Sequence, residues 1–168
     1  LEGLKLNLFG AYTYNIVENS QYLPTSVWAN GQAYKGTKKR ESLLGNMMLT
    51  YKKNWKKHFF DVLALAELQK ETYTGYYTTV SNFSTDKFGY NNLQAGALRL
   101  WEGTNSYYDQ PRLASFMGRF NYTYADRYVL TLNARTDASS KFGANHKWGF
   151  FPSASAAWVI SEEEFMKQ

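Results

Sequence analysis

Residues 114–137, ASFMGRFNYTYADRYVLTLNARTD, alternate apolar and polar side chains over almost their whole length. Alternation with a period of two is typical of a β-strand whose two faces meet different surroundings. A tight turn at Ala125-Asp126-Arg127 divides the stretch into two strands. Two environments fit this pattern. In a soluble sheet the apolar face packs into a core, whereas in an outer-membrane barrel it meets lipid and the polar face lines the lumen.

The same alternation recurs along the chain, so we expect an all-β fold of antiparallel strands. The expected strands lie near 3–14, 42–52, 58–69, 113–124, 127–137 and 149–160. The range 58–69 is ambiguous, because its Leu and Ala content also suits a short helix. Aromatic residues make up 18% of the chain, which favours strands. No apolar run approaches the roughly 20 residues that a membrane-spanning helix needs.

The expected connections alternate between long and short. Residues 15–41 and about 71–111 are expected to be long irregular stretches, whereas the turns near 53–57 and 125–127 are short. Strict alternation places all the long connections at one end of an antiparallel sheet. Membrane barrels have this asymmetry, with short periplasmic turns and long extracellular loops. A soluble barrel or sandwich does not require it.

Aromatic residues gather at the ends of the apolar stripes. They are Tyr12 and Tyr14 at the long-loop end, and Tyr51, Tyr122, Tyr124, Tyr128 and Trp158 at the short-turn end. Rings with a polar edge are typical of membrane interfaces. The opposite face carries Arg119 and Arg135 at mid-strand, where an Arg facing lipid costs about 2–4 kcal/mol. We therefore expect the apolar stripes to face lipid and the polar faces to line a lumen.

The last third of the chain carries a run of short motifs in a fixed order. These motifs are Asn121-Tyr122-Thr123-Tyr124, Asp126-Arg127-Tyr128, Arg135-Thr136-Asp137, Ser139-Ser140-Lys141-Phe142-Gly143, Trp148-Gly149-Phe150-Phe151-Pro152-Ser153-Ala154 and Glu164-Phe165-Met166. Together they resemble a segment of the SusC/RagA family of TonB-dependent outer-membrane transporters. The match covers about fifty residues. The part of the chain before them shares the general strand pattern of the family but none of these specific motifs. Ala138 departs from the family pattern, which usually has Gly after the Asp.

The resemblance implies a barrel of about 22 strands with an N-terminal plug. It also implies import of glycans or peptides, energised through TonB, beneath a surface lipoprotein of the SusD type. Residues 1–168 are then expected to be a partial barrel region without the plug, located in the outer membrane. Both ends of the chain look like cuts, so we expect a fragment whose edge strands lack partners and which aggregates or oligomerises when isolated.

Candidate ligand-binding residues fall into two groups. Polar side chains of the expected lumen face form the first group, and aromatic residues of the second long connection form the other, because aromatic faces stack on sugar rings. They are Arg119, Asn121, Asn133, Arg135 and Asp137, and Trp101, Tyr107 and Tyr108, with Tyr76, Tyr77 and Tyr90 as further aromatics. A structural role competes in each case. Arg135 and Asp137 can brace the wall as a same-strand pair, and the aromatics can pack an interface with the lid.

Catalysis has little support, and the chain is expected not to be an enzyme and to need no cofactor or metal. It has no Cys, and its two histidines, His58 and His146, are interpreted as solvated loop residues. The glutamates at 162–164 are interpreted as a solvated turn. The basic clusters at 35–40 and 52–57 are not expected to bind nucleic acid. The first of them is either solvated or paired with lipopolysaccharide phosphates in the outer-membrane lipid. The rival interpretation of the whole chain is a soluble β-sandwich that binds carbohydrate.

Overall fold

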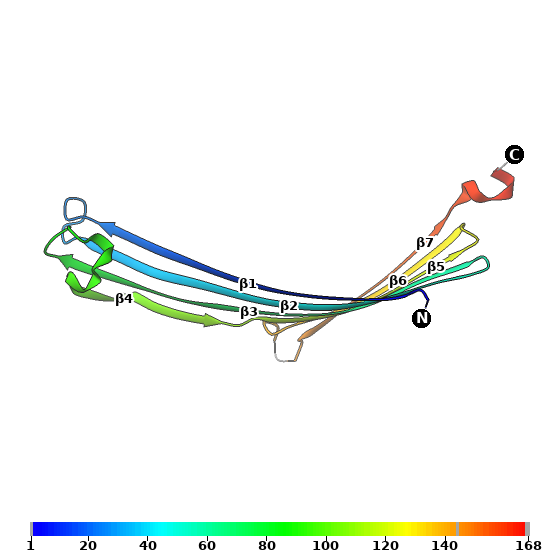
Figure 1. The fold of residues 1–168 in the computed structure, drawn as a ribbon, viewed down its shortest axis with the longest axis horizontal. Coiled ribbons are helices and arrows are strands. Elements are labelled where there is room, and N and C mark those ends of the chain that lie inside the picture. Colours follow the sequence, from blue (N-terminus) through cyan, green and yellow to red (C-terminus); the bar gives the residue numbers. More distant parts are fainter. Residues whose placement is uncertain (1, 144, 167–168) are drawn as a thin grey trace. The chain divides into compact units, whose positions relative to one another are not determined.

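The computed structural model describes residues 2–143 and 145–166, which are almost entirely strand (Figure 1). The strands are β1 (Leu4–Leu23), β2 (Gln32–Trp55), β3 (His58–Phe83), β4 (Gly96–Asp109), β5 (Arg112–Tyr124), β6 (Tyr128–Ser139) and β7 (Trp148–Trp158). Within the described ranges there are also four single-turn 3-10 helices: η1 (Gly89–Asn91), η2 (Leu93–Ala95), η3 (Ile160–Glu162) and η4 (Glu164–Met166). Within these described ranges, no helix has the length and apolar character needed to cross a membrane.

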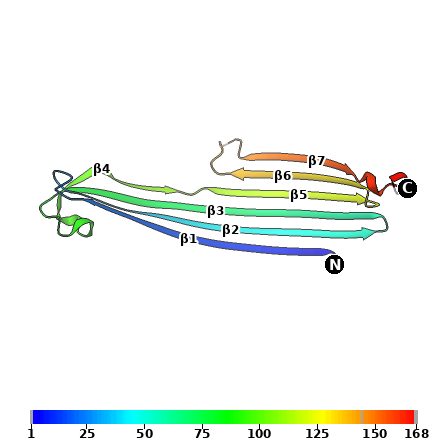
Figure 2. The ribbon, with the colours of Figure 1, turned by 90° about the horizontal axis from the view of Figure 1, so that it is seen from above.

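The described strands form one sheet in the order β1-β2-β3-β5-β6-β7. β3 pairs antiparallel with β5 over His58–Lys70 and with β4 over Tyr73–Phe83. Figure 2 shows β5, β6 and β7 side by side in sequence order. A β-sandwich needs a second packed sheet, and the described residues provide a single one. The segment 58–69, whose composition also suited a short helix, is strand throughout.

The antiparallel registers of β3, β5, β6 and β7 give these strands the two faces expected from the sequence. Gly118 lies opposite Ala64 on β3 and Ala134 on β6, whereas the adjacent Arg119 lies opposite Leu63 and Asn133. The apolar face of β3, β5, β6 and β7 carries Phe60, Val62, Ala64, Leu68, Phe116, Phe120, Leu130, Leu132, Ala154 and Ala156. The other face carries Asp61, Glu67, Arg119, Asn121, Asn133, Arg135 and Asp137, whereas Lys70 and Arg112 lie at the end of the apolar face. The alternation in the sequence therefore corresponds to two physically different sheet faces.

The strands extend well beyond the ranges expected from the sequence. β1 continues past residue 14 to Leu23, β2 begins at Gln32 instead of near 42, and β3 continues past residue 69 to Phe83. Most of the two stretches expected to be irregular is therefore strand, including β4. The extension of β3 is rich in Tyr and Thr, which favour strands. They were missed because polar side chains occupy both of their faces, and the apolar alternation that marks the other strands is absent.

By its contacts the chain divides into two compact units, with β1, β2 and β3 each contributing residues to both. The first unit comprises residues 1–11, 43–70 and 111–168, and the second comprises residues 12–42 and 71–110. In the second unit Ala33, Val80 and Phe83 form a small buried cluster, against which Tyr22, Leu93 and Ala95 pack.

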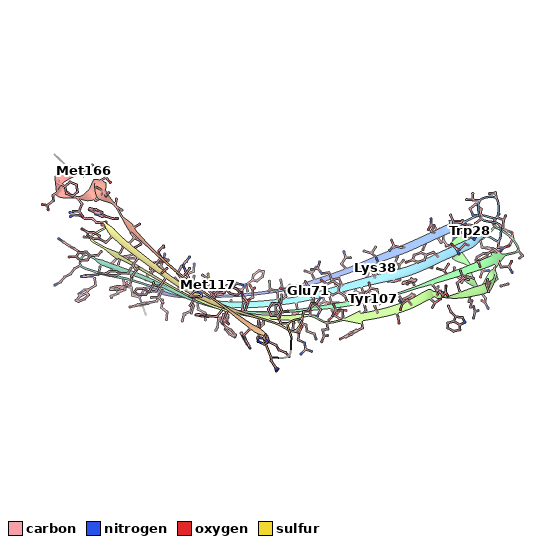
Figure 3. All side chains as sticks on the ribbon, turned by 180° about the vertical axis from the view of Figure 1, so that it is seen from behind. Trp28, Lys38, Glu71, Tyr107, Met117 and Met166 are labelled. Atoms are coloured by element: carbon pink, nitrogen blue, oxygen red, sulfur yellow. The ribbon has the colours of Figure 1, made fainter. Side chains whose placement is uncertain are left out.

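The first unit has no comparable core in the part of the chain that the structure describes. Its apolar residues stand on an uncovered face, with 44% of the Phe116 side chain and 43% of the Leu132 side chain exposed. Figure 3 shows side chains standing out from both sides of these strands. Large apolar side chains of soluble proteins are normally covered, so this face requires an apolar environment outside the chain.

Candidate functional site

The polar face of the first unit collects the five polar residues that the sequence singles out. Arg119 is the register partner of Asn133, and Asn121 lies opposite Thr131 in the next row. Arg135 and Asp137 continue along β6 on the same face. Asn133 Nδ2 donates a hydrogen bond of 3.2 Å to Ser153 Oγ on β7. The structure therefore brings these residues together on neighbouring strands.

Arg135 and Asp137 form the same-strand pair that the sequence suggested as a wall brace. Arg135 Nε donates to both carboxylate oxygens of Asp137, at 3.0 and 2.9 Å. Arg135 Nη2 also donates to Ser115 Oγ on the neighbouring strand, at 3.3 Å. This bidentate, charge-assisted geometry fixes the orientation of the guanidinium, and the link to Ser115 ties β6 to β5.

A small hollow adjoins this pair on the polar face. It has a volume of about 210 Å³ and is lined by Glu67, Gln69, Leu113, Ser115, Arg135 and Asp137. Two carboxylates and one guanidinium around a hollow favour a ligand rich in hydroxyl or amide groups, which can donate to the acids and accept from the base. Glu67 and Ser115 were not singled out from the sequence, although their position in the alternation places them on this face.

Two buried polar atoms of the polar face have no hydrogen-bond partner among the described residues: Arg119 Nε and Asp61 Oδ1. The other oxygen of the carboxylate, Asp61 Oδ2, lies 3.4 Å from Lys52 Nζ. Unsatisfied buried groups cost free energy unless a further partner is supplied. This face therefore retains unused hydrogen-bonding capacity for a bound molecule or another part of the full protein.

The three aromatic candidates lie on strand β4 of the second unit, and they do not share one face. Tyr107 is the register partner of Gly75, and a Cβ added at Gly75 would fall 2.6 Å from the Tyr107 ring. Tyr107 thus fills the space that a side chain at Gly75 would need. Tyr108 points to the opposite side of β4, and Trp101 is 88% exposed. Tyr107 has a packing role, whereas Trp101 and Tyr108 offer free ring surface.

A row of aromatic rings crosses the sheet at the short-turn end of the first unit. Tyr124 and Tyr128 stack with ring centroids 6.3 Å apart, and Tyr128 stacks on Trp158 at the same distance. His58 extends the row, 4.9 Å from the Tyr124 ring and 5.6 Å from the Trp55 ring. The interpretation of His58 as a solvated loop residue is therefore wrong. It is the first residue of β3 and lies among aromatic rings.

Glu163 anchors the segment that follows β7, and its interpretation as part of a solvated turn is also wrong. Only 9% of the residue is exposed. Its carboxylate accepts hydrogen bonds from Arg127 Nη1 at 2.8 Å, Tyr128 Oη at 2.7 Å and Trp158 Nε1 at 3.0 Å. The bond from Tyr128, together with those from Trp158 and Arg127, lowers the pKa of Glu163 below its usual value. At the short-turn end, the Glu163 carboxylate thus connects the segment after β7 to Arg127, Tyr128 and Trp158, next to the aromatic row.

Asp86 plays a comparable role in the second unit. Its carboxylate accepts from the hydroxyls of Tyr22 and Thr25, each at 2.7 Å, and from the backbone N–H of Thr25 at 3.1 Å. These bonds, led by the one from Tyr22, lower the pKa of Asp86. Burial, reinforced by Asp86, raises the pKa of Tyr22 to about 12. The connection after β3 is thereby tied to the connection after β1.

The apolar stripe, the aromatic row at its end and the charged opposite face define a wall segment of a transmembrane β-barrel. Solved structures share this fold. The RagAB peptide importer in its open-open state superposes with a TM-score of 0.88 at 20% identity, over 100% of this chain and 19% of that one. The RagAB peptide transporter gives a TM-score of 0.87 at 19% identity, with the same coverage.

The sequence of the chain is similar to those of curated proteins. The chain is 31% identical to TonB-dependent receptor P3 of Formosa agariphila over 171 residues, covering 99% of this chain and 17% of that protein. It is 29% identical to TonB-dependent receptor SusC of Bacteroides thetaiotaomicron, covering 96% of this chain and 16% of that protein. No protein-family model matches. The chain belongs to the TonB-dependent receptors, which are outer-membrane proteins, and spans about a sixth of these two relatives.

Proposed function

We propose that the full protein containing this chain imports a glycan or a peptide across the outer membrane, and that this chain forms part of the barrel wall. The observation that carries the proposal is the pairing of an uncovered apolar face with a face bearing Arg119, Arg135 and Asp137 on the same strands. Such strands separate lipid from an aqueous passage. Its relatives named as TonB-dependent receptors and as a peptide transporter support the same role.

The proposed partners are those expected of the family. We propose that TonB energises import through a part of the protein outside this chain, and that a SusD-like surface lipoprotein closes over the extracellular end. Within this chain the work is passive: the wall supplies binding groups and positions them, with no catalytic step, cofactor or metal.

The proposed cargo contacts are the polar residues of the lumen face. Arg119 has an unsatisfied Nε that can donate to a hydroxyl or carbonyl oxygen of the cargo. Asn121 and Asn133 present amides in the neighbouring rows. Arg135 and Asp137 are already bonded to each other, so we propose that they mainly fix the wall and contact cargo from the side of the small hollow.

The aromatic residues are the second part of the proposed contact surface. We propose that Trp101 and Tyr108, whose rings are exposed, stack on sugar rings or on peptide side chains. Tyr107 contributes indirectly, because its ring is placed over Gly75.

The test uses the full-length receptor and measures uptake of labelled oligosaccharides and oligopeptides by cells that depend on it. Arg119→Gln is expected to lower uptake of the true cargo several-fold without lowering receptor abundance in the outer membrane. Lys57→Gln, in the short turn after β2, is the control for loss of one positive charge and is expected to leave uptake unchanged. Equal uptake by the wild type and by a receptor-deletion strain, for every cargo offered, would refute the import role.

A further inference from the structure

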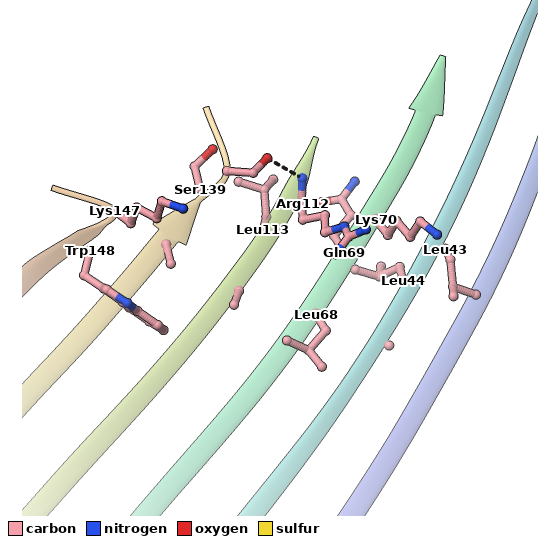
Figure 4. Close-up of a pocket in the computed structure, with 14 residues that line it drawn as sticks. Leu43, Leu44, Leu68, Gln69, Lys70, Arg112, Leu113, Ser139, Lys147 and Trp148 are labelled. Atoms are coloured by element: carbon pink, nitrogen blue, oxygen red, sulfur yellow. Dashed lines mark hydrogen bonds between the residues drawn. The ribbon is translucent and has the colours of Figure 1, made fainter. Parts of the chain in front are cut away.

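The apolar face of the first unit contains a groove close to the ends of the strands that are opposite to the short turns. It has a volume of about 820 Å³. The groove exists because small residues occupy one row of the sheet: Ala114 on β5 lies between Leu68 on β3 and Ala138 on β6. Trp148 is the partner of Ala138 and closes the row on the β7 side, and Leu43 lies on the β2 side (Figure 4).

Three basic side chains lie at this groove. Lys70 and Arg112 are register partners in the row beyond Leu68, and Lys147 directly precedes Trp148 (Figure 4). Lys70 and Arg112 place two positive charges in one row of the sheet, and an anion bound between them would be attracted by both. Ser140 Oγ accepts from the backbone N–H of Arg112 at 2.9 Å, and Ser140 N–H donates to the Arg112 carbonyl at 3.0 Å. These bonds fix the backbone that carries Arg112.

The basic row lies at a membrane interface. Between the His58–Tyr124 pair and the Lys70–Arg112 pair the strands rise about 40 Å, at about 3.3 Å a residue. With the usual tilt of about 35–45° this corresponds to a depth of about 30 Å, which is the thickness of the hydrocarbon layer. Because the aromatic row marks the periplasmic interface, Lys70 and Arg112 reach the outer one.

A second apolar hollow continues the groove toward the membrane centre. It has a volume of about 400 Å³ and includes Ala66, Phe116, Gly118 and Ala134. From the Lys70–Arg112 pair to the Gly118–Ala64 pair the strands rise about 20 Å. An apolar track of this length, with a basic end at the interface, has the dimensions of one lipid leaflet.

We propose that this groove binds a lipid of the outer leaflet whose headgroup carries phosphate, with the phosphate between Lys70 and Arg112, near Lys147, and an acyl chain along Leu68 and Phe116. Charge complementarity commits the site to an anionic lipid, since an uncharged apolar partner would gain nothing from the three cations. The site is on the lipid side of the wall and is separate from the proposed cargo contacts.

The experiment is native mass spectrometry of the full-length receptor, released from detergent micelles and titrated with diphosphoryl lipid A or with dioleoylphosphatidylcholine. The wild type is expected to retain lipid A and not phosphatidylcholine. Each cation near an anionic surface contributes roughly a fivefold gain in affinity, so the double variant Lys70→Gln, Arg112→Gln is expected to bind lipid A about 25-fold more weakly. The matched control is Lys53→Gln, near the end of β2, combined with Lys57→Gln in the short turn, with an expected change below about threefold.

Two further measurements decide between a lipid and a free anion. Ala114→Phe fills the groove with an apolar side chain that the lipid face tolerates, and it is expected to reduce lipid A binding while all three cations remain. Inorganic phosphate is expected not to displace lipid A. The proposal is overturned if both charge variants weaken binding equally, if Ala114→Phe has no effect, if phosphate displaces the lipid, or if phosphatidylcholine binds as tightly.

Discussion

A single arginine placed on either face of the wall tests the orientation on which the rest depends. Ala134 lies on the apolar face, opposite Gly118, about halfway between the aromatic row at Tyr124 and the basic row at Arg112. Ser153 lies one strand away at nearly the same depth, on the polar face opposite Asn133. Both residues are exposed in the structure, so neither substitution creates a steric conflict within the chain.

The expected cost follows from the depth. At the membrane midplane an outward-facing Arg costs about 2–4 kcal/mol, whereas a lumen-facing Arg costs little. Ala134→Arg is therefore expected to lower the free energy of unfolding by about 2–4 kcal/mol. Ser153→Arg loses one exposed hydrogen bond, from Asn133 at 3.2 Å, and is expected to cost less than about 1 kcal/mol.

Guanidinium unfolding of the full-length receptor in phospholipid vesicles, followed by tryptophan fluorescence, measures both variants by linear extrapolation. The informative quantity is the difference between the two variants, because it cancels the general effect of an added charge. Equal losses of stability, or a larger loss for Ser153→Arg, would refute the assignment of the apolar face to lipid.

Three further predictions concern the turns and connections. Glu163→Gln is expected to raise the rate of amide hydrogen exchange in residues 159–166 roughly tenfold, whereas Glu164→Gln is expected to leave that rate unchanged. Because the pKa of Glu163 is lowered, the protection of these amides against exchange holds above the usual pKa of about 4.3 and is lost as pH falls through the lowered pKa. Ala125 has a φ of 53°, which a residue with a Cβ atom adopts at a cost in free energy. Ala125→Gly is therefore expected to stabilise the folded receptor by about 0.5–1 kcal/mol in the same guanidinium assay. A loss of stability in this variant would contradict the prediction. Asp86→Ala is expected to speed proteolysis of residues 84–95 at pH 7, and in the wild type the same acceleration is expected as pH falls through the lowered pKa of Asp86; unchanged cleavage would rule out the tie to Tyr22.

The two faces of the wall could be predicted from the sequence because lipid imposes a strict rule on one of them. Every residue that the alternation assigned to the apolar side of β5 and β6 lies there, and Arg119 and Arg135 lie opposite. The Arg135–Asp137 pair was also within reach, since residues two apart on a strand share a face. The registers between strands could not be predicted, because alternation alone does not determine which residues of neighbouring strands lie opposite each other.

The features that were missed lie where no such rule operates. The extensions of β1, β2 and β3 carry polar side chains on both faces, so the apolar alternation that would have identified them is absent. Glu163 is one of three consecutive glutamates, and nothing in the sequence distinguishes the one that Arg127, Tyr128 and Trp158 surround. His58 was misjudged because a basic turn precedes it, although its parity on β3 matches that of Phe60.

Among its described residues the first unit has no buried interior, and this has a consequence for how its two faces can change. In most domains a change of recognition residue disturbs packing, and the two kinds of selection compete. Here the proposed cargo-contact surface and the apolar surface belong to the same strands but lie on opposite faces, so a substitution at Asn121 or Asn133 does not change the side chains of the apolar face. Substitutions that change the proposed cargo contacts are thus expected to carry little penalty in folding.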